Sequence, residues 1–280
     1  MGADQPTVFG IGAWEVEDRL MSYTMVTFEQ RDRVAWLTLN RPQAMNSLHP
    51  DMVEEMHAAL DQVALDQTLR ALVISGSGGK AFCAGADLKF IEAALHDLRP
   101  FKAYVRRLND ALFRLEALPI PVIAVVRGFA LAGGLELLLA CDYTLSAETA
   151  KIGDQHLNFA LLPGAGSSQR LPRRIGLQRA LYLITTGARL SGKEAQEWGI
   201  VLRAVPEESL DAEVERLLDA LRTKSRDALS AVKRAIRNGL EMPLRQGVDY
   251  EGEVLLAHME TSQDMRRRLQ AFLDKRPVSF

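Results

Sequence analysis

Apolar positions along the chain follow two patterns, short continuous runs and helical spacing. The short runs are rich in Val, Ile and Leu and predict strands, at residues 23–30, 33–39, 71–75, 120–126, 142–146, 150–153 and 200–204. Apolar residues three and four positions apart predict helices, at residues 51–66, 88–96, 100–117, 168–174, 178–186, 209–223, 226–238, 243–258 and 261–273. Strands that alternate with helices and then give way to helices alone predict an α/β fold with parallel strands and a helical C-terminal region.

The order of these elements divides the chain into three parts. Residues 22–205 hold every predicted strand and form the α/β core. Residues 206–280 are helical, and we expect them to serve assembly, since Phe272 and Lys275 occur in a late, basic segment. The alternative is that these helices only cover their own subunit. Residues 1–21 lack the basic start and apolar centre of a secretory signal, so we expect a poorly ordered N-terminal extension.

Composition excludes several classes of function. The chain has 280 residues, of which 48% are apolar and 25% charged, which is typical of a globular protein. Its formal net charge of −2 predicts neither a nucleic-acid partner nor a membrane-surface partner. No apolar run approaches the roughly 18 residues of a membrane-spanning helix. Cys83 and Cys141 have neither metal-ligand spacing nor a disulfide pattern, so we expect no metal site and a cytoplasmic protein.

A glycine-rich segment, residues 126–136, follows a predicted strand and leads into a buried helical turn. It contains Gly128, Gly133 and Gly134, and glycine lets a ligand approach bare N–H groups. The first N–H groups of a helix have no internal partner, so this segment predicts an anion or oxyanion site. Glu136, among apolar residues, needs a partner or a chemical role. Two other interpretations stay open: glycines that only allow tight packing, and a glutamate that only favours the helix start.

A second segment, residues 80–89, repeats this pattern of strand end and small residues. Two N–H donors that converge from different loops would hold a thioester oxygen as the thioester becomes an enolate. Each such donor contributes about 3 kcal/mol in a site without water. The alternative is that this segment is a simple surface turn, and the segment alone is weak evidence for a site.

Four motifs occur in order along the chain. They are Leu39-Asn-Arg-Pro-Gln-Ala-Met-Asn-Ser-Leu48, Ala81-Phe-Cys-Ala-Gly-Ala-Asp-Leu-Lys89, Gly128-Phe-Ala-Leu-Ala-Gly-Gly-Leu-Glu-Leu137, and Leu162-Pro-Gly-Ala-Gly166 with Gln169-Arg170. Together they resemble the crotonase, or enoyl-CoA hydratase/isomerase, superfamily over about residues 23–276. The resemblance implies a spiral β-β-α core, a homotrimer or homohexamer assembled by the C-terminal helices, and an acyl-CoA substrate. Coenzyme A would enter as part of that substrate, with no tightly bound cofactor.

The resemblance also implies roles for individual residues. It places the oxyanion-hole N–H groups on Ala86 and Gly133. The residues implied to bind coenzyme A are Gln43, Ala44, Met45 and Ala84, together with Phe272 and Lys275, which would reach the nucleotide of a neighbouring subunit. A cation and an aromatic ring suit a phosphorylated adenosine.

The catalytic pair departs from the family pattern at one position. Typical hydratases carry two glutamates; the first falls on Glu136, but the second falls on His156. His156 either replaces the missing carboxylate as acid or base, or binds a polar acyl group, or is a passive substitute in a decayed site. Its ordinary pKa suits either proton-transfer role. Asp154 would orient the imidazole if the loop turns it inward, and is otherwise a surface residue.

The expected function is hydration of a 2-enoyl-CoA, or the reverse dehydration, with Glu136 as principal base. The alternatives are double-bond isomerisation by a single base, or another reaction of the family such as decarboxylation or C–C hydrolysis. A third class of function is a non-catalytic protein that binds CoA esters.

Overall fold

The computed structural model describes residues 23–277, so the N-terminal extension predicted for residues 1–21 lies outside the described residues. Its larger sheet has six strands in the order β1-β2-β3-β5-β7-β10. Their bounds are β1 Val26–Arg31, β2 Val34–Leu39, β3 Ala71–Gly76, β5 Val122–Val126, β7 Tyr143–Ala147 and β10 Arg203–Val205. β1 pairs antiparallel with β2, and the remaining pairs are parallel. The predicted α/β class with parallel strands is confirmed.

A second sheet of four short strands, in the order β4-β6-β8-β9, accompanies the first. Its strands are β4 Ala81–Cys83, β6 Phe129–Leu131, β8 Lys151–Gly153 and β9 Leu190–Ser191. Of these, the sequence pattern predicted β8 alone. The prediction of loops at β4 and β6 was wrong, because strands of two or three residues are too short to show a period. Since β4, β6 and β8 each follow a strand of the large sheet after a short turn, the chain repeats a strand–strand unit.

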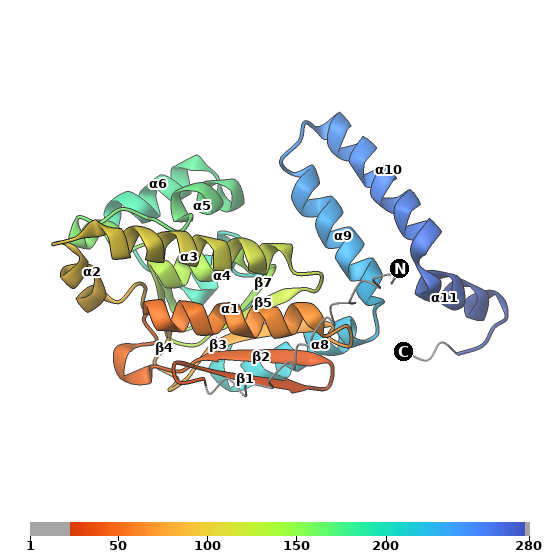
Figure 1. Cartoon of the computed structure of the whole chain (residues 1–280), viewed down its shortest axis with the longest axis horizontal. Helices are drawn as coiled ribbons and strands as arrows, with labels where there is room; N and C mark the ends of the chain where they lie inside the picture. The colour runs from red at the N-terminus through yellow and green to blue at the C-terminus, as the bar shows by residue number, and fades with distance from the viewer. Residues whose placement is uncertain (1–22, 278–280) are drawn as a thin grey trace, which may run out of the picture.

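Helices cover this core, and one short helix, α4, lies inside it. The helices up to the last core strand are α1 Pro50–Leu65, α2 Leu88–Ala94, α3 Leu98–Ala117, α4 Gly133–Ala140, α5 Ser167–Ile175, α6 Leu177–Thr186 and α7 Gly192–Glu197. The 3-10 turns are η1 Pro42–Ala44, η2 His156–Phe159 and η3 Glu207–Ser209. Figure 1 shows α1 and α3 side by side over the sheets. Every residue of α4 is buried, so this helix is surrounded by the protein on all sides.

The last strand of the core is shorter than predicted. A strand was expected over residues 200–204, but β10 begins at Arg203. Ile200 and Val201 are buried, yet their N–H groups donate to the carbonyl of Ala195 at the end of α7, at 2.8 and 3.1 Å. These two residues therefore close a helix rather than extend a sheet.

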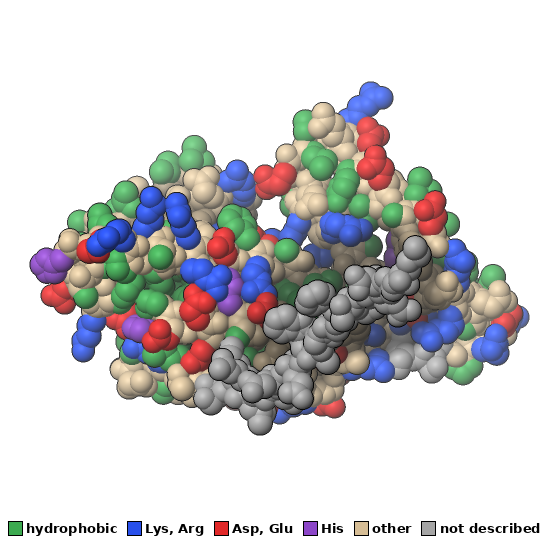
Figure 2. Space-filling model, viewed as in Figure 1, with side chains coloured by type: hydrophobic (Ala, Val, Ile, Leu, Met, Phe, Trp, Pro, Cys, Tyr) green, Lys and Arg blue, Asp and Glu red, His purple; other side chains and the backbone are tan. Residues whose placement is uncertain are grey.

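The described chain after β10 is helical, with α8 Leu210–Arg222, α9 Arg226–Gly239, α10 Leu244–Thr261 and α11 Gln263–Leu273. α8 packs Leu210, Val214 and Leu218 against the large sheet. α9 and α10 pair with each other and extend away from the body (Figure 1). Figure 2 shows hydrophobic side chains gathered on this hairpin. The exposed large apolar residues of α9–α11 are Val232, Ile236, Leu244, Val248, Leu255, Leu256, Met259, Leu269, Phe272 and Leu273.

This exposed apolar surface fits the expected role of residues 206–280 in assembly, which stays a prediction. Among residues 23–277, the helices are too short or too polar to cross a membrane.

Candidate active site

Glu136 lies in the first turn of α4 and is 2% exposed. Its Oε1 accepts hydrogen bonds from the backbone N–H groups of Ala165 and Ser167, at 2.7 and 3.0 Å. Burial raises the pKa of Glu136, and the two N–H groups oppose that rise in part. The carboxylate is therefore held at one oxygen, is more basic than an exposed glutamate, and can use its other oxygen for proton transfer.

His156 faces that second oxygen. It opens η2 directly after β8, and its Nε2 lies 3.9 Å from Oε2 of Glu136. Its Nδ1 lies 2.8 Å from Oδ1 of Asp154, and the same oxygen accepts the backbone N–H of His156 at 3.1 Å. Asp154 has no exposed surface. The interpretation of Asp154 as a surface residue is therefore wrong, because the turn after β8 directs its side chain inward against the imidazole.

Charge alternates along this line of three side chains. Burial is the largest influence on Asp154 and opposes its ionisation, but the hydrogen bonds and charge of His156, together with the side chain of Ser167, lower the pKa of Asp154 overall. Burial also opposes a charged imidazole, but the hydrogen bond and charge of Asp154 and the charge of Glu136 raise the pKa of His156. An imidazolium between two carboxylates is thus favoured, with Nδ1–H donated to Asp154 and Nε2–H directed toward Glu136.

The two N–H groups predicted to form an oxyanion hole lie close together. A Cβ atom built on Gly133 would lie 3.4 Å from the nitrogen of Ala86, and one built on Gly85 would lie 3.3 Å from the nitrogen of Gly133. Within residues 23–277, neither N–H group donates a hydrogen bond. Gly85 has φ +113°, which favours glycine, and the missing side chains leave the two N–H groups open to a ligand. The arrangement suits an oxygen that gains negative charge.

Two residues that the sequence analysis missed hold the Ala86 side of this hole. Leu48 accepts the N–H of Asp87 at 3.1 Å and donates its own to Gly85 at 2.8 Å. The hydroxyl of Tyr104, on α3, donates to the same Leu48 carbonyl at 3.0 Å. Leu48 belongs to the first family motif, which was a signal for it. Nothing in the sequence connects Tyr104 to residue 48, because the contact spans 56 positions.

The loop predicted to bind coenzyme A adjoins the oxyanion hole. Met45 has φ +51°, and its carbonyl accepts the N–H of Ala84 at 3.1 Å. Gln43 and Ala44 lie in η1 directly before it. Asn46 is buried and fixes the loop, with its side chain donating to the carbonyls of residues 77 and 81 at 3.0 and 2.8 Å. The structure therefore brings residues 43–45 and 84 to one place beside residue 86.

Phe272 and Lys275 are elsewhere in the same chain. Phe272 lies in α11 and is 76% exposed, and Lys275 follows that helix. α11 is at the opposite end of the molecule from α2 and β4 (Figure 1). One chain does not bring these two residues to its own site, and their action in a neighbouring subunit stays a prediction.

Comparisons with known proteins identify the family and the fold. Residues 29–280 match the family model described as enoyl-CoA hydratase/isomerase. A probable enoyl-CoA hydratase echA8 of Mycobacterium tuberculosis is 36% identical over 93% of this chain and 99% of its own length. A crotonyl-CoA hydratase of Syntrophomonas wolfei is also 36% identical, over the same shares of the two chains.

Among solved structures, an enoyl-CoA hydratase from Bacillus anthracis superposes with a TM-score of 0.86. It is 36% identical, and the match covers 92% of this chain and 99% of that one. The fold is thus the crotonase fold, with a helical C-terminal region. The chain belongs to the enoyl-CoA hydratase/isomerase family of the crotonase superfamily.

Proposed function

We propose that this protein adds water to a 2-enoyl-CoA, or catalyses the reverse dehydration. The observation that carries the proposal is the pair of proton-transfer groups, Glu136 and His156, whose facing atoms are 3.9 Å apart next to two free N–H groups. Relatives that cover nearly all of the chain bear hydratase names. Coenzyme A enters as part of the substrate, and no tightly bound cofactor takes part.

The thioester oxygen accepts the N–H groups of Ala86 and Gly133. When water attacks C3, the electrons of the C2=C3 bond move toward the thioester and negative charge develops on this oxygen. Donors fixed in place before the reaction stabilise that charge more than they stabilise the substrate. The CoA moiety extends along the loop of residues 43–45, where η1 and the Met45 turn expose backbone.

The two side chains divide the proton transfers. A water molecule about 2.8 Å from both Oε2 of Glu136 and Nε2 of His156 would bridge the two groups from one side, because these atoms are only 3.9 Å apart. Glu136 takes one proton from this water as its oxygen bonds to C3. The protonated His156 then donates its Nε2 proton to C2, and the thioester carbonyl re-forms. The substrate gains one water in all, and the proton on Glu136 returns to His156 before the next turnover.

Double-bond isomerisation is a second candidate. Oε1 of Glu136 is held by two N–H groups, whereas Oε2 accepts no hydrogen bond within residues 23–277. One free carboxylate oxygen can remove a proton from C2 of a 3-enoyl-CoA and return it to C4. His156 would then bind the acyl group rather than transfer a proton.

Absorbance of the conjugated enoyl thioester separates the two reactions. We expect the protein to remove the absorbance of a short 2-enoyl-CoA, because hydration destroys the conjugated double bond. An increase with a 3-enoyl-CoA and no loss with the 2-enoyl-CoA would instead establish isomerisation. Binding of both thioesters without any change would contradict hydration and isomerisation alike.

Replacement of His156 tests its role as the acid. We expect His156→Gln to lower kcat by about 100-fold, a typical contribution of one acid–base group. Glu136 must be ionised and His156 protonated, so the wild-type rate rises with pH through the raised pKa of Glu136 and falls through the raised pKa of His156. The variant should lose the fall at high pH. A His258→Gln control should keep both the rise and the fall of the rate with pH. Normal rates in His156→Gln would instead make His156 a passive residue.

We also propose a homotrimer or homohexamer in which Phe272 and Lys275 of one chain bind the nucleotide of coenzyme A in another. Lys275→Ala should then raise KM for enoyl-CoA several-fold with little change in kcat, since uniform binding energy is lost. Light scattering gives the mass of the assembly. A monomer with unchanged KM in the variant would contradict this proposal.

A further inference from the structure

The segment from Gly164 to Ser167 positions the carboxylate of Glu136. Its residues 165 and 167 donate the two N–H groups that Oε1 accepts. The segment is itself held from α3, because Asn109 donates from its side chain to the carbonyl of Gly164 at 2.9 Å. Any shift of this segment would therefore move the base.

Arg170, one turn into α5, holds the middle of the segment. Its Nη1 donates to the carbonyl of Ala165 at 2.9 Å, so both polar groups of residue 165 are engaged, one by Glu136 and one by Arg170. Gly166 has φ +103°, and a Cβ atom there would lie 2.0 Å from Nη1 of Arg170. The glycine thus makes room for the guanidinium as well as for the turn.

The other edge of the guanidinium is fixed by Glu116, near the end of α3. Nε and Nη2 of Arg170 donate to the two oxygens of Glu116 at 2.8 and 3.0 Å, a paired geometry that sets both position and orientation. The Arg170 side chain is only 14% exposed. A partly buried, bidentate pair of this kind orients its partners more strictly than a surface pair.

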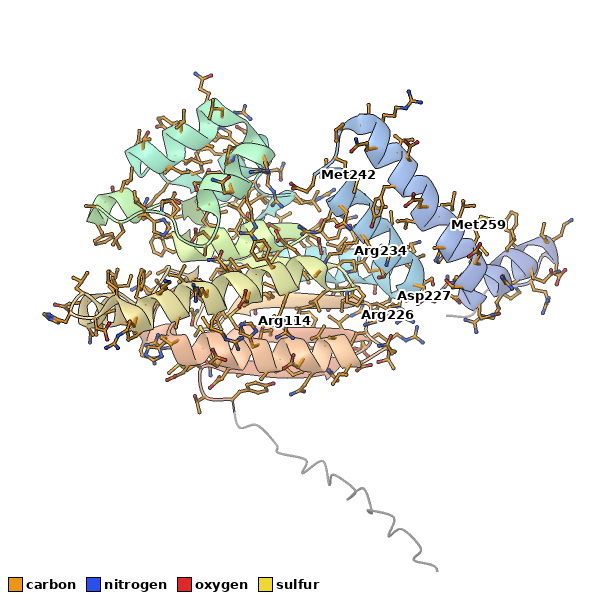
Figure 3. All side chains as sticks on the ribbon, turned by 45° about the horizontal axis from the view of Figure 1, so that its top comes forward. Arg114, Arg226, Asp227, Arg234, Met242 and Met259 are labelled. Atoms are coloured by element: carbon orange, nitrogen blue, oxygen red, sulfur yellow. The ribbon has the colours of Figure 1, made fainter. Side chains whose placement is uncertain are left out.

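Glu116 in turn contacts α9. Nη1 of Arg237 lies 3.3 Å from Oε1 of Glu116, and Nη2 of Arg237 lies 2.7 Å from Oδ1 of Asp142. Lys233, one turn earlier on α9, lies 2.7 Å from the other oxygen of Asp142. Figure 3 shows Arg226 where α9 leaves the body and Met242 near the turn into α10. These contacts line a cleft of about 960 Å³ between α3, α5 and α9.

We propose that Arg170 is a positioning residue for Glu136, and that α9 sets the position of Arg170 through Arg237 and Glu116. The chain of contacts runs from α9 to Glu116, to Arg170, to the carbonyl of Ala165 and to the carboxylate. This inference rests on the proposed function, because it takes Glu136 as the base of the reaction. It gives the C-terminal helices a part in the chemistry of their own subunit.

The pH dependence of the rate reports this coupling. The N–H groups of residues 165 and 167 favour the ionised form of Glu136. A looser segment weakens those bonds, so the acid limb of the rate profile moves to higher pH. The other titratable groups around Glu136 are Asp154 and His156 after β8, Cys83 on β4 and Tyr104 on α3. None of these four contacts Arg170, so their effect on the limb stays constant in the comparison.

Three variants test the inference. Arg170→Lys keeps the positive charge but loses the bidentate guanidinium. It should lower kcat about tenfold or more, because small misplacements of a catalytic group have effects of this size, and it should leave KM little changed. Its acid limb should rise by about one pH unit, the size of one weakened hydrogen bond to a charge. Arg237→Gln should change kcat and the acid limb in the same directions, but by smaller amounts. Arg173→Lys, on the same helix but exposed, is the control and should match wild type.

Two results would overturn the inference. If Arg170→Lys melts at a lower temperature but keeps the kcat and acid limb of Arg173→Lys, Arg170 is merely structural. If Arg237→Gln matches wild type, α9 has no part in positioning. A titration of carboxyl-¹³C glutamate by NMR, with Glu136 assigned from Glu136→Gln, measures the same pKa without turnover. A protein without hydratase activity would therefore refute the proposed function while this titration still tests Arg170.

Discussion

Glu136→Gln lowers kcat for hydration by about 10⁴-fold, with little change in KM. The amide has the shape of the carboxylate and can still accept the N–H groups of Ala165 and Ser167 through its oxygen, so the segment keeps its place. It cannot take a proton from water, and loss of a general base costs up to about 10⁴-fold. Initial rates with a short 2-enoyl-CoA measure the effect, and Glu148→Gln, at an exposed position, is the matched control.

The same variant should not be less stable than wild type at neutral pH. Burial raises the pKa of Glu136, so the folded state holds this proton more tightly than the unfolded chain does. The stabilising contribution is therefore complete at low pH and is lost as pH rises through the folded pKa. Removing a buried charge at neutral pH costs the fold nothing by this route. Undiminished turnover in Glu136→Gln would remove Glu136 from the mechanism.

Ala86→Pro lowers kcat by about 10²- to 10³-fold, because proline has no N–H and one of the two oxyanion donors is lost. The N–H of Ala86 makes no hydrogen bond within residues 23–277, so the fold does not depend on it. The residue before it is Gly85, and glycine tolerates the backbone restriction that a following proline imposes. Loss of rate with retained CoA binding is the expected pattern.

Ala86→Gly is the control for this variant, since it changes the side chain but keeps the donor. Its rate should stay near that of wild type. Circular dichroism and the melting temperature show whether Ala86→Pro folds. A folded Ala86→Pro protein with the kcat of Ala86→Gly would mean that Ala86 does not stabilise the enolate, and Gly133 would then have to act alone.

The long elements of this fold could be predicted because each is long enough to show its period. α1, α3 and the strands β2, β3 and β5 agree with the apolar pattern to within a few residues. The second sheet, apart from β8, could not be predicted in this way. β4 and β6 have three residues each, and their pairing is set by contacts with strands far away in the sequence.

The residues of the candidate site likewise divide into those that a sequence motif predicts and those whose position depends on the folded structure. Gly133 and Glu136 are neighbours in one motif, and the departure at His156 was visible in the sequence. That Asp154 lies against the imidazole depends on the direction of the turn after β8, which no pattern of residue types gives. Arg170 stood in a quoted motif, but its bond to the carbonyl of Ala165 depends on the positive φ of Gly166.

The central claim is that Glu136 and His156 add one water across the double bond of a 2-enoyl-CoA. Mass spectrometry of the product formed in ¹⁸O-labelled water tests it directly. We predict a 3-hydroxyacyl-CoA that carries one ¹⁸O atom, formed rapidly by the wild type, about 100-fold more slowly by His156→Gln and about 10⁴-fold more slowly by Glu136→Gln. Unlabelled product, no product, or labelled product formed equally fast by all three proteins would contradict it.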